Sequence, residues 1–133
     1  MPQATANPVH PNFFILYVDS PLKSAAFYAS LFSVKPVEES PTFALFALQN
    51  GSMFGLWSKH TVTPAAQQSF GGAEVAFAME SRAAVMEVHT QWIAQKLPII
   101  QAPVELDFGF TFVATDPDGH RLRVFAPNSE PNV

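Results

Sequence analysis

Cysteine is absent from this chain of 133 residues, which excludes disulfide bonds and thiolate metal sites. Basic residues are few: seven Lys plus Arg leave a formal net charge of −4. Nucleic acid is therefore not an expected partner, because phosphate binding needs a basic surface. No apolar run reaches the roughly eighteen residues of a membrane span, and the first residues lack the basic start and apolar stretch of a signal peptide. We therefore expect a cytoplasmic protein with no membrane partner.

Aromatic residues, in contrast, are abundant. The chain has thirteen Phe, two Trp and two Tyr, and 48% of its residues are hydrophobic. That content can build one core, so we expect residues 1–133 to form a single domain. Many Phe usually indicate core packing, whereas an aromatic-lined pocket is the alternative interpretation.

Two turn sequences separate runs in which apolar and other residues alternate. Asp116-Pro117-Asp118-Gly119 combines a fixed φ, side chains that accept backbone hydrogen bonds, and a Gly that tolerates positive φ. Asn50-Gly51 is a strong signal for a tight hairpin turn. The sequence therefore predicts two β-hairpins, with strands over residues 42–48, 52–58, 110–115 and 120–125.

The same order of elements occurs twice along the chain. A strand over 13–18 precedes a helix that Ser20 caps and Pro21 begins. A strand over 74–79 precedes a helix that Ser81 caps and that extends to Lys96. The expected elements between this helix and the last hairpin are a short strand over 97–101 and a loop over 103–108. The pattern is typical of an internal repeat.

The final hairpin resembles the last hairpin of the vicinal-oxygen-chelate superfamily, which includes glyoxalase I, extradiol dioxygenases and the bleomycin- and phenazine-resistance proteins. Val18-Asp19 followed by Ser24-Ala25-Ala26-Phe27-Tyr28 is similar to the signature of its first module. The resemblance implies an α+β fold of two βαβββ modules, over 12–58 and 73–127, joined by a linker over 59–72. Their curved sheets would enclose a cleft. It also implies a homodimer, either domain-swapped or sharing the cleft across its interface.

Enzymes of this superfamily bind a divalent metal through His, Glu or Gln at four strand positions. Matched to this sequence, the four positions fall on Phe13, on a residue within 54–57, on Glu74 and on Arg123. Only Glu74 could ligate a metal, and a carboxylate beside a guanidinium predicts an ion pair instead. The resemblance thus implies neither a metal nor another cofactor. The pair either replaces the metal structurally or binds polar groups of a ligand.

The alternation of side chains across a strand predicts which residues face the cleft. A two-residue turn at Asn50-Gly51 would pair Phe46 with Gly55 and place both on the face of Trp57. Gly55 would then leave a slot between two rings. A four-residue loop in the last hairpin would place Phe112 on the face of Arg123. A shift of one residue in either register would exchange the two faces.

The likeness is closest to phenazine-resistance proteins, and no Ser-His-Asp or Cys-His arrangement predicts catalytic residues. We therefore expect a homodimer that binds and sequesters a planar aromatic compound such as a phenazine antibiotic. The alternatives are a lyase, isomerase or dioxygenase with a degenerate metal site around Glu74, or an interaction dimer with an unused cleft. The residues expected to bind ligand are Trp57, Phe108, Phe46, Gly55, Phe112, Glu74 and Arg123.

Overall fold

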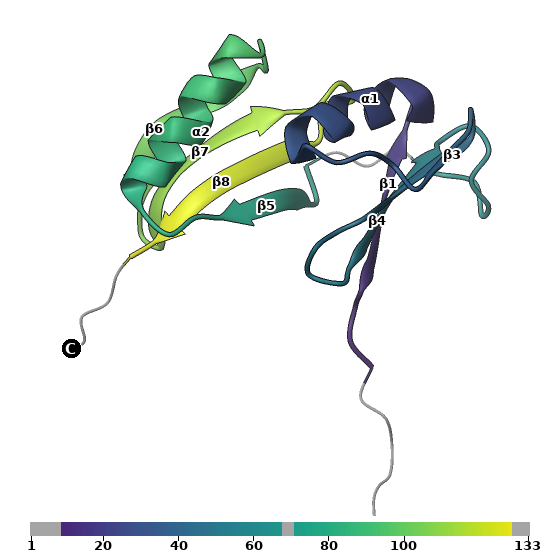
Figure 1. Ribbon diagram of the computed structural model, residues 1–133, viewed down its shortest axis with the longest axis horizontal. Helices are drawn as coiled ribbons and strands as arrows, with labels where there is room; N and C mark the ends of the chain where they lie inside the picture. Colours follow the sequence, from purple (N-terminus) through teal and green to yellow (C-terminus); the bar gives the residue numbers. More distant parts are fainter. Residues whose placement is uncertain (1–8, 68–70, 129–133) are drawn as a thin grey trace, which may run out of the picture. The chain divides into compact units, whose positions relative to one another are not determined.

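The computed structural model describes residues 9–67 and 71–128 (Figure 1). The chain divides into two compact units, Met1–Ala66 and Gln67–Val133. Each unit contains one helix and a four-stranded sheet, which confirms the predicted α+β fold. The elements are β1 (Phe13–Val18), α1 (Pro21–Phe32), β2 (Glu38–Glu39), β3 (Phe43–Ala47), β4 (Met53–Ser58), β5 (Glu74–Ala78), α2 (Arg82–Ala94), β6 (Ile99–Leu106), β7 (Gly109–Thr115) and β8 (Arg121–Pro127).

The two sheets have the same topology. Their strand orders are β1-β4-β3-β2 and β5-β8-β7-β6. In each sheet the first strand pairs in parallel with the last, and the last pairs antiparallel with the strand before it. A parallel pair needs a crossover, and the helix that follows the first strand supplies it. Each unit is therefore one βαβββ module, as the repeated order of elements predicts.

Both helices begin where the sequence predicts. Ser20 and Ser81 are the N-caps, and their side chains accept hydrogen bonds from the backbone N–H groups of Lys23 and Ala84. Such a bond satisfies one of the free amides in the first turn. Helix α1 ends at Phe32, and its C-cap Ser33 has φ +57, three residues before Pro36. Among the described residues, no helix is long and apolar enough to cross a membrane.

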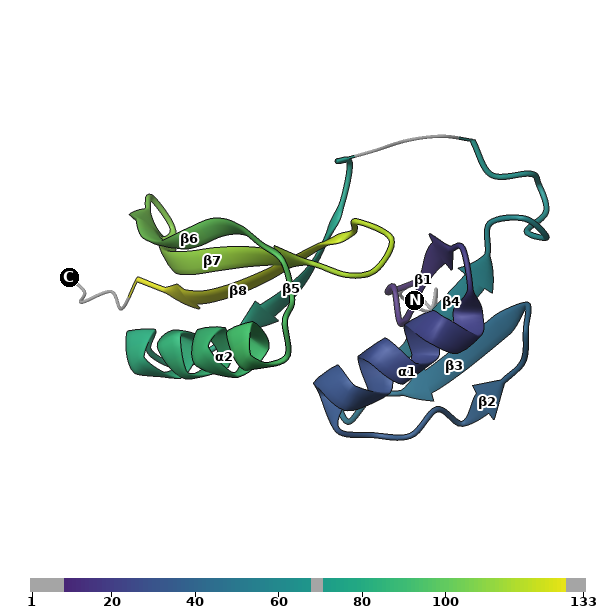
Figure 2. The ribbon, with the colours of Figure 1, turned by 90° about the horizontal axis from the view of Figure 1, so that it is seen from above.

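Each helix covers one face of the sheet in its own unit (Figure 2). Under α1, the ring of Phe32 packs edge-on against Phe46 and Phe54, with centroids 5.7 Å and 5.4 Å away. Under α2, Trp92 packs edge-on against Phe112 at 5.6 Å. These rings form the cores of the two units, and the opposite face of each sheet carries no helix of its own unit.

Both hairpin turns contain three residues, and this length corrects the predicted registers. Leu48 pairs with Ser52 around Gln49-Asn50-Gly51, and Asp116 pairs with His120 around Pro117-Asp118-Gly119. The third loop residue has positive φ in each case, +90 at Gly51 and +88 at Gly119. This is the three-residue hairpin loop that closes with a left-handed residue. The two turns occupy equivalent hairpin tips of the two modules.

The corrected registers move two expected ligand-binding residues to the helix-covered faces. Phe46 pairs with Phe54, not Gly55, and Phe112 pairs with Val124. Both rings are completely buried beneath their helices. The prediction that they face the cleft is wrong, because a loop of odd length shifts the pairing by one residue and a one-residue shift exchanges the faces.

The stretch before the last hairpin also differs from the prediction. Residues 103–106, predicted as loop, continue strand β6, whose pairing with β7 shifts between Ile99 and Val104. Strand β6 is the edge of its sheet, where a bulge and Pro103 are both tolerated. The turn to β7 consequently shortens to Asp107 and Phe108.

Candidate ligand-binding faces

The uncovered face of the first unit's sheet is aromatic. Phe13 and Ile15 of β1, Phe43 of β3 and Trp57 of β4 line a hollow of about 350 Å³. The side chains of Phe13 and Ile15 are 46% and 41% exposed. Parallel pairing sets Ile15 beside Gly55, so the two strands present these side chains on the same face. The hollow can accept a flat apolar group against aromatic rings.

Phe43, rather than Phe46, is the ring beside Trp57. The two residues are register partners, and their rings meet edge-to-face with centroids 6.1 Å apart and planes at 90°. The Phe43 ring also covers Gly55: a Cβ on Gly55 would stand 3.0 Å from its Cζ. The ring-sized gap predicted at Gly55 is therefore filled, and the absence of a side chain there allows Phe43 to approach the sheet.

The uncovered face of the second unit's sheet is polar and centres on an ion pair. Arg123 donates from Nε to Oε1 of Glu74 at 2.7 Å and from Nη2 to Oε2 at 2.9 Å. The side chains are 18% and 30% exposed. The hydrogen bonds from Arg123 lower the pKa of the Glu74 carboxyl, and the same bonds raise the pKa of Arg123. The predicted pairing is confirmed, and it joins the neighbouring strands β5 and β8.

Three other polar side chains complete this face. The Nη1 of Arg123 donates to Gln101 Oε1 at 3.4 Å and to Thr111 Oγ1 at 3.3 Å. Thr111 in turn donates to the carbonyl oxygen of Val124 at 2.8 Å. A second cation, Arg121, places Nη1 4.0 Å from Glu74 Oε2. The guanidinium of Arg123 is thus fixed from three strands, whereas Arg121 has a looser contact.

Two rings border the ion pair. Phe108 stands in the β6–β7 turn, and its ring meets Phe125 edge-on with centroids 5.9 Å apart. The guanidinium carbon of Arg123 lies 5.7 Å from the centroid of Phe108. Asn128 holds the turn by donating from its backbone to Phe108 O at 3.0 Å and from its side chain to Asp107 O at 2.8 Å. The turn therefore holds Phe108 next to the charged groups while leaving it 44% exposed.

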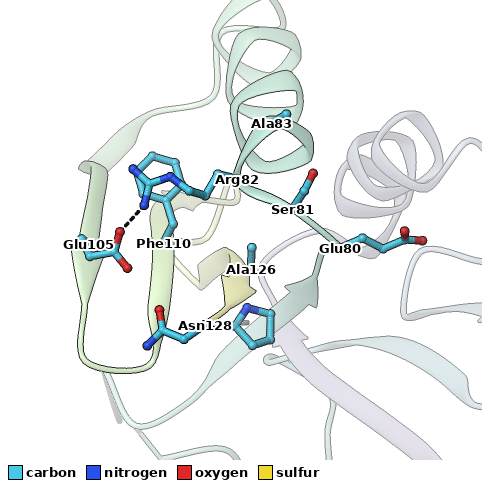
Figure 3. Close-up of a pocket in the computed structure, with 9 residues that line it drawn as sticks. Glu80, Ser81, Arg82, Ala83, Glu105, Phe110, Ala126 and Asn128 are labelled. Atoms are coloured by element: carbon cyan, nitrogen blue, oxygen red, sulfur yellow. Dashed lines mark hydrogen bonds and ion pairs between the residues drawn. The ribbon is translucent and has the colours of Figure 1, made fainter. Parts of the chain in front are cut away.

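The helix-covered side of the second unit has a separate hollow of about 630 Å³ at the start of α2 (Figure 3). Arg82 lines this hollow together with Phe110 and Glu105. Its guanidinium carbon lies 4.1 Å from the centroid of Phe110, and its Nη1 donates to Oε1 of Glu105. Its charge is thus matched by a carboxylate and an aromatic face within the unit. Arg82 therefore connects α2 to the β6–β7 hairpin through Glu105 and Phe110.

Comparison with known proteins places the chain in a family. Residues 10–124 match the Glyoxalase/Bleomycin resistance protein/Dioxygenase superfamily. The chain belongs to this superfamily. The phenazine antibiotic resistance protein EhpR of Enterobacter agglomerans is 29% identical over 119 residues, which cover 87% of this chain and 91% of that protein. The predicted resemblance is therefore confirmed.

Solved structures support the same fold. A solution NMR structure of an Agrobacterium tumefaciens protein is 51% identical, with a TM-score of 0.84 over 92% of this chain and 100% of that one. A crystal structure of lactoylglutathione lyase from Agrobacterium tumefaciens is 20% identical, with a TM-score of 0.75 over 90% of this chain and 95% of that chain. The latter likeness is one of fold alone.

The metal positions of the superfamily do not fit a metal in this chain. The resemblance matches the first position to Phe13 and the second to a residue within 54–57, a stretch with no imidazole or carboxylate. It matches the third and fourth to Glu74 and Arg123, and in the structure both oxygens of that carboxylate accept hydrogen bonds from the guanidinium. Within residues 9–67 and 71–128, no group of three or more His, Cys, Asp or Glu side chains could hold a metal ion. The donor chemistry is that of an ion pair.

The register error also explains which face residues the sequence reasoning missed. Phe43 and Thr111 are not among the residues that the sequence predicts to bind ligand. Both belong on the open faces once each loop is counted as three residues. The available signal was the Gly at the end of each turn, because a three-residue hairpin loop needs a left-handed residue there.

Proposed function

We propose that this protein binds and sequesters a planar aromatic compound, such as a phenazine-type antibiotic, without transforming it, and thereby confers resistance. The observation that carries the proposal is the aromatic hollow of the first unit, where Trp57 and Phe43 stand beside exposed Phe13. Similarity to a phenazine antibiotic resistance protein over most of both chains supports a role in resistance.

Stacking and apolar burial would supply the binding energy. Aromatic contacts contribute about 0.5–1.5 kcal/mol beyond the area that they bury, and burial contributes about 25 cal/mol per Å². A flat ring system covers more of the hollow's rings than a small polar molecule does.

We propose ligand-binding residues on the uncovered face of each unit. In the first unit they are Trp57 from the sequence, with Phe13, Ile15 and Phe43 added from the structure. In the second unit they are Phe108, Glu74 and Arg123. Gly55 lies beneath the Phe43 ring and is not among them.

Sequestration is favoured over catalysis by the chemistry of the metal positions. A lyase, isomerase or dioxygenase of the superfamily type would need a divalent ion to polarise substrate oxygens. Phe13 and Arg123 occupy two of those positions here, and neither can donate an electron pair to a metal. Glu74, the remaining carboxylate, has a lowered pKa and is a weak base.

Calorimetric titration with phenazine tests the proposal through Trp57. We expect Trp57→Ala to weaken binding about tenfold or more, because it removes both stacking and buried area. Trp57→Phe should retain much of the affinity. Leu22→Ala is the control: Leu22 is an exposed apolar residue of α1, the helix on the opposite face of the sheet from the hollow.

The control should bind phenazine as wild type does. If Trp57→Ala folds normally and keeps wild-type affinity, the first unit's hollow is not the binding site. If wild type does not bind phenazine or related flat ring systems at all, the proposed function is wrong.

A further inference from the structure

Arginine is concentrated on the uncovered face of the second unit's sheet. The chain has three Arg in all and a net charge of −4, yet Arg121 and Arg123 stand two residues apart on β8 and share this face. The third, Arg82, belongs to α2 on the covered side, where Glu105 and Phe110 engage it. The protein as a whole is acidic, but two of its three arginines lie on this one face, so this face is locally basic.

The charges on this face do not cancel. Glu74 uses both oxygens to pair with Arg123. The Arg121 guanidinium stands 4.0 Å from the same carboxylate, beyond hydrogen-bond reach, and its side chain is 49% exposed. Among the described residues, Glu74 is the one carboxylate within 4.0 Å of either guanidinium, so two cations and one anion leave a charge of +1.

We propose that this face recognises a carboxylate on the planar aromatic ligand, with Arg121 as the group that binds it. The inference rests on the proposed function and specifies the class of ligand. A guanidinium offers parallel N–H donors that match a carboxylate in a bidentate fork. Arg123 is held by Glu74, Gln101 and Thr111, so its role is to neutralise Glu74 and leave Arg121 to the ligand.

Apolar side chains on the same face make it a binding surface of its own, in addition to the aromatic hollow of the first unit. Phe125 lies at the other end of β8 from Arg121 and pairs with Ala78 of β5. The ring of Phe108 packs against Phe125 there. Ala76 and Ala78 are small and exposed, so no large side chain of β5 blocks this stretch. Phe125 is four residues along β8 from Arg121, a distance of about 13 Å at about 3.3 Å per residue. A fused ring system bearing one carboxylate can span that interval.

The test uses three probes that differ in one substituent: phenazine-1-carboxylate, phenazine-1-carboxamide and phenazine. Isothermal titration of the full chain should give the carboxylate an affinity about tenfold or more above that of the neutral carboxamide, as expected for a charge-assisted hydrogen bond. Arg121→Gln should remove this preference while leaving carboxamide binding within about twofold of wild type. Arg121→Lys keeps the positive charge but cannot make the bidentate hydrogen bonds of a guanidinium, so it should retain part of the preference for the carboxylate.

Arg82→Gln is the matched control, because it removes the same charge from the same unit on the covered side of the sheet. It should keep the wild-type preference for the carboxylate. Equal binding of all three probes by wild type would overturn the inference and leave the proposed function intact. Loss of the preference in Arg82→Gln as well would overturn it too, since net charge rather than Arg121 would then set the selectivity. Failure of all three probes to bind would overturn both proposals.

Discussion

At the scale of single residues, Arg123 is the residue around which the polar face is built. The resemblance to the superfamily matches Arg123 to a position expected to carry a metal-binding carboxylate, and in the structure Arg123 pairs with the carboxylate of Glu74. All three guanidinium nitrogens are engaged, by Glu74, Gln101 and Thr111. A planar donor fixed on three sides is pre-organised, so the polar face keeps its arrangement without an ion.

Breaking this pair should destabilise the second unit. We expect Glu74→Gln and Arg123→Gln each to lower the free energy of unfolding by about 1–3 kcal/mol at pH 7, the range for charged hydrogen bonds. A dry ion pair would cost about 3–5 kcal/mol, but water reaches these side chains, which are 30% and 18% exposed. A double-mutant cycle by urea denaturation measures the coupling, which should exceed about 0.5 kcal/mol.

The same cycle at low pH supplies the control. Because pairing lowers the pKa of Glu74 below its ordinary value of 4.5, the stabilisation is complete above that value and is lost as the pH falls through the pKa of the folded state. The stability difference between wild type and Glu74→Gln should therefore shrink steadily below about pH 4. A coupling energy of zero at pH 7, or one that does not change down to pH 2, would contradict the pairing.

At the scale of secondary-structure elements, Gly109 is the position where the backbone demands glycine. It begins β7 with φ +151, and a Cβ there would stand 2.1 Å from the carbonyl oxygen of Ala126 on β8. We expect Gly109→Ala to cost about 2–5 kcal/mol of unfolding free energy, from backbone strain and steric overlap together. The substitution should also displace Phe108, the preceding residue, and weaken ligand binding.

Gly51→Ala is the matched control at a hairpin turn. Gly51 also has positive φ, +90, but nothing lies within 4 Å of an added Cβ. Its cost should be limited to about 1–2 kcal/mol of backbone strain. Equal destabilisation by the two variants in urea denaturation would show that the contact between β7 and β8 at Gly109 does not matter.

Local signals predicted the elements well, and pairing between elements less well. Ser20, Ser81 and Pro21 define the helix starts through chemistry confined to a few residues, so the sequence is sufficient. Asn50-Gly51, in contrast, fits both a two-residue turn and the end of a three-residue loop. The packing of Phe46 beneath α1 decides between them. Because this contact cannot be read from the sequence, the sequence alone does not decide the register of the hairpin or which face Phe46 occupies.

The candidate site was predictable to the same extent. The ion pair of Glu74 and Arg123 followed from superfamily positions whose side chains share one face of neighbouring strands. The prediction that Trp57 and Gly55 share one face holds whatever the turn length, because side chains alternate along β4, and in the structure that face is the uncovered one. Phe43 was missed because its face depends on the register across the turn.

At the scale of the whole molecule, one topology carries two different surfaces. The sheets of the two units share their strand order and pairing, yet one uncovered face is built from aromatic rings and the other from a guanidinium–carboxylate network. The strand order and the position of the helix are the same in both units, so one topology supports two chemically different uncovered faces.

We also propose that the protein is a homodimer. Strand β1 is the edge of its sheet and exposes Phe13, Phe14, Ile15 and Tyr17, a long apolar edge that soluble chains usually cover. Light scattering coupled to size-exclusion chromatography should give twice the 14.5 kDa chain mass. Tyr17→Glu should shift the protein toward the monomer, whereas Leu22→Glu, an exposed site on α1, should not. A monomeric wild type at micromolar concentration would contradict the proposal.

The most direct measurement of the central claim is a calorimetric titration of phenazine into the full chain with excess EDTA, followed by mass spectrometry of the recovered ligand. The account predicts saturable binding that EDTA does not change, and phenazine recovered with its mass unaltered, because rings and an ion pair stand where metal ligands would be needed. No saturable binding, binding that requires a divalent ion, or a ligand recovered in altered form would contradict it.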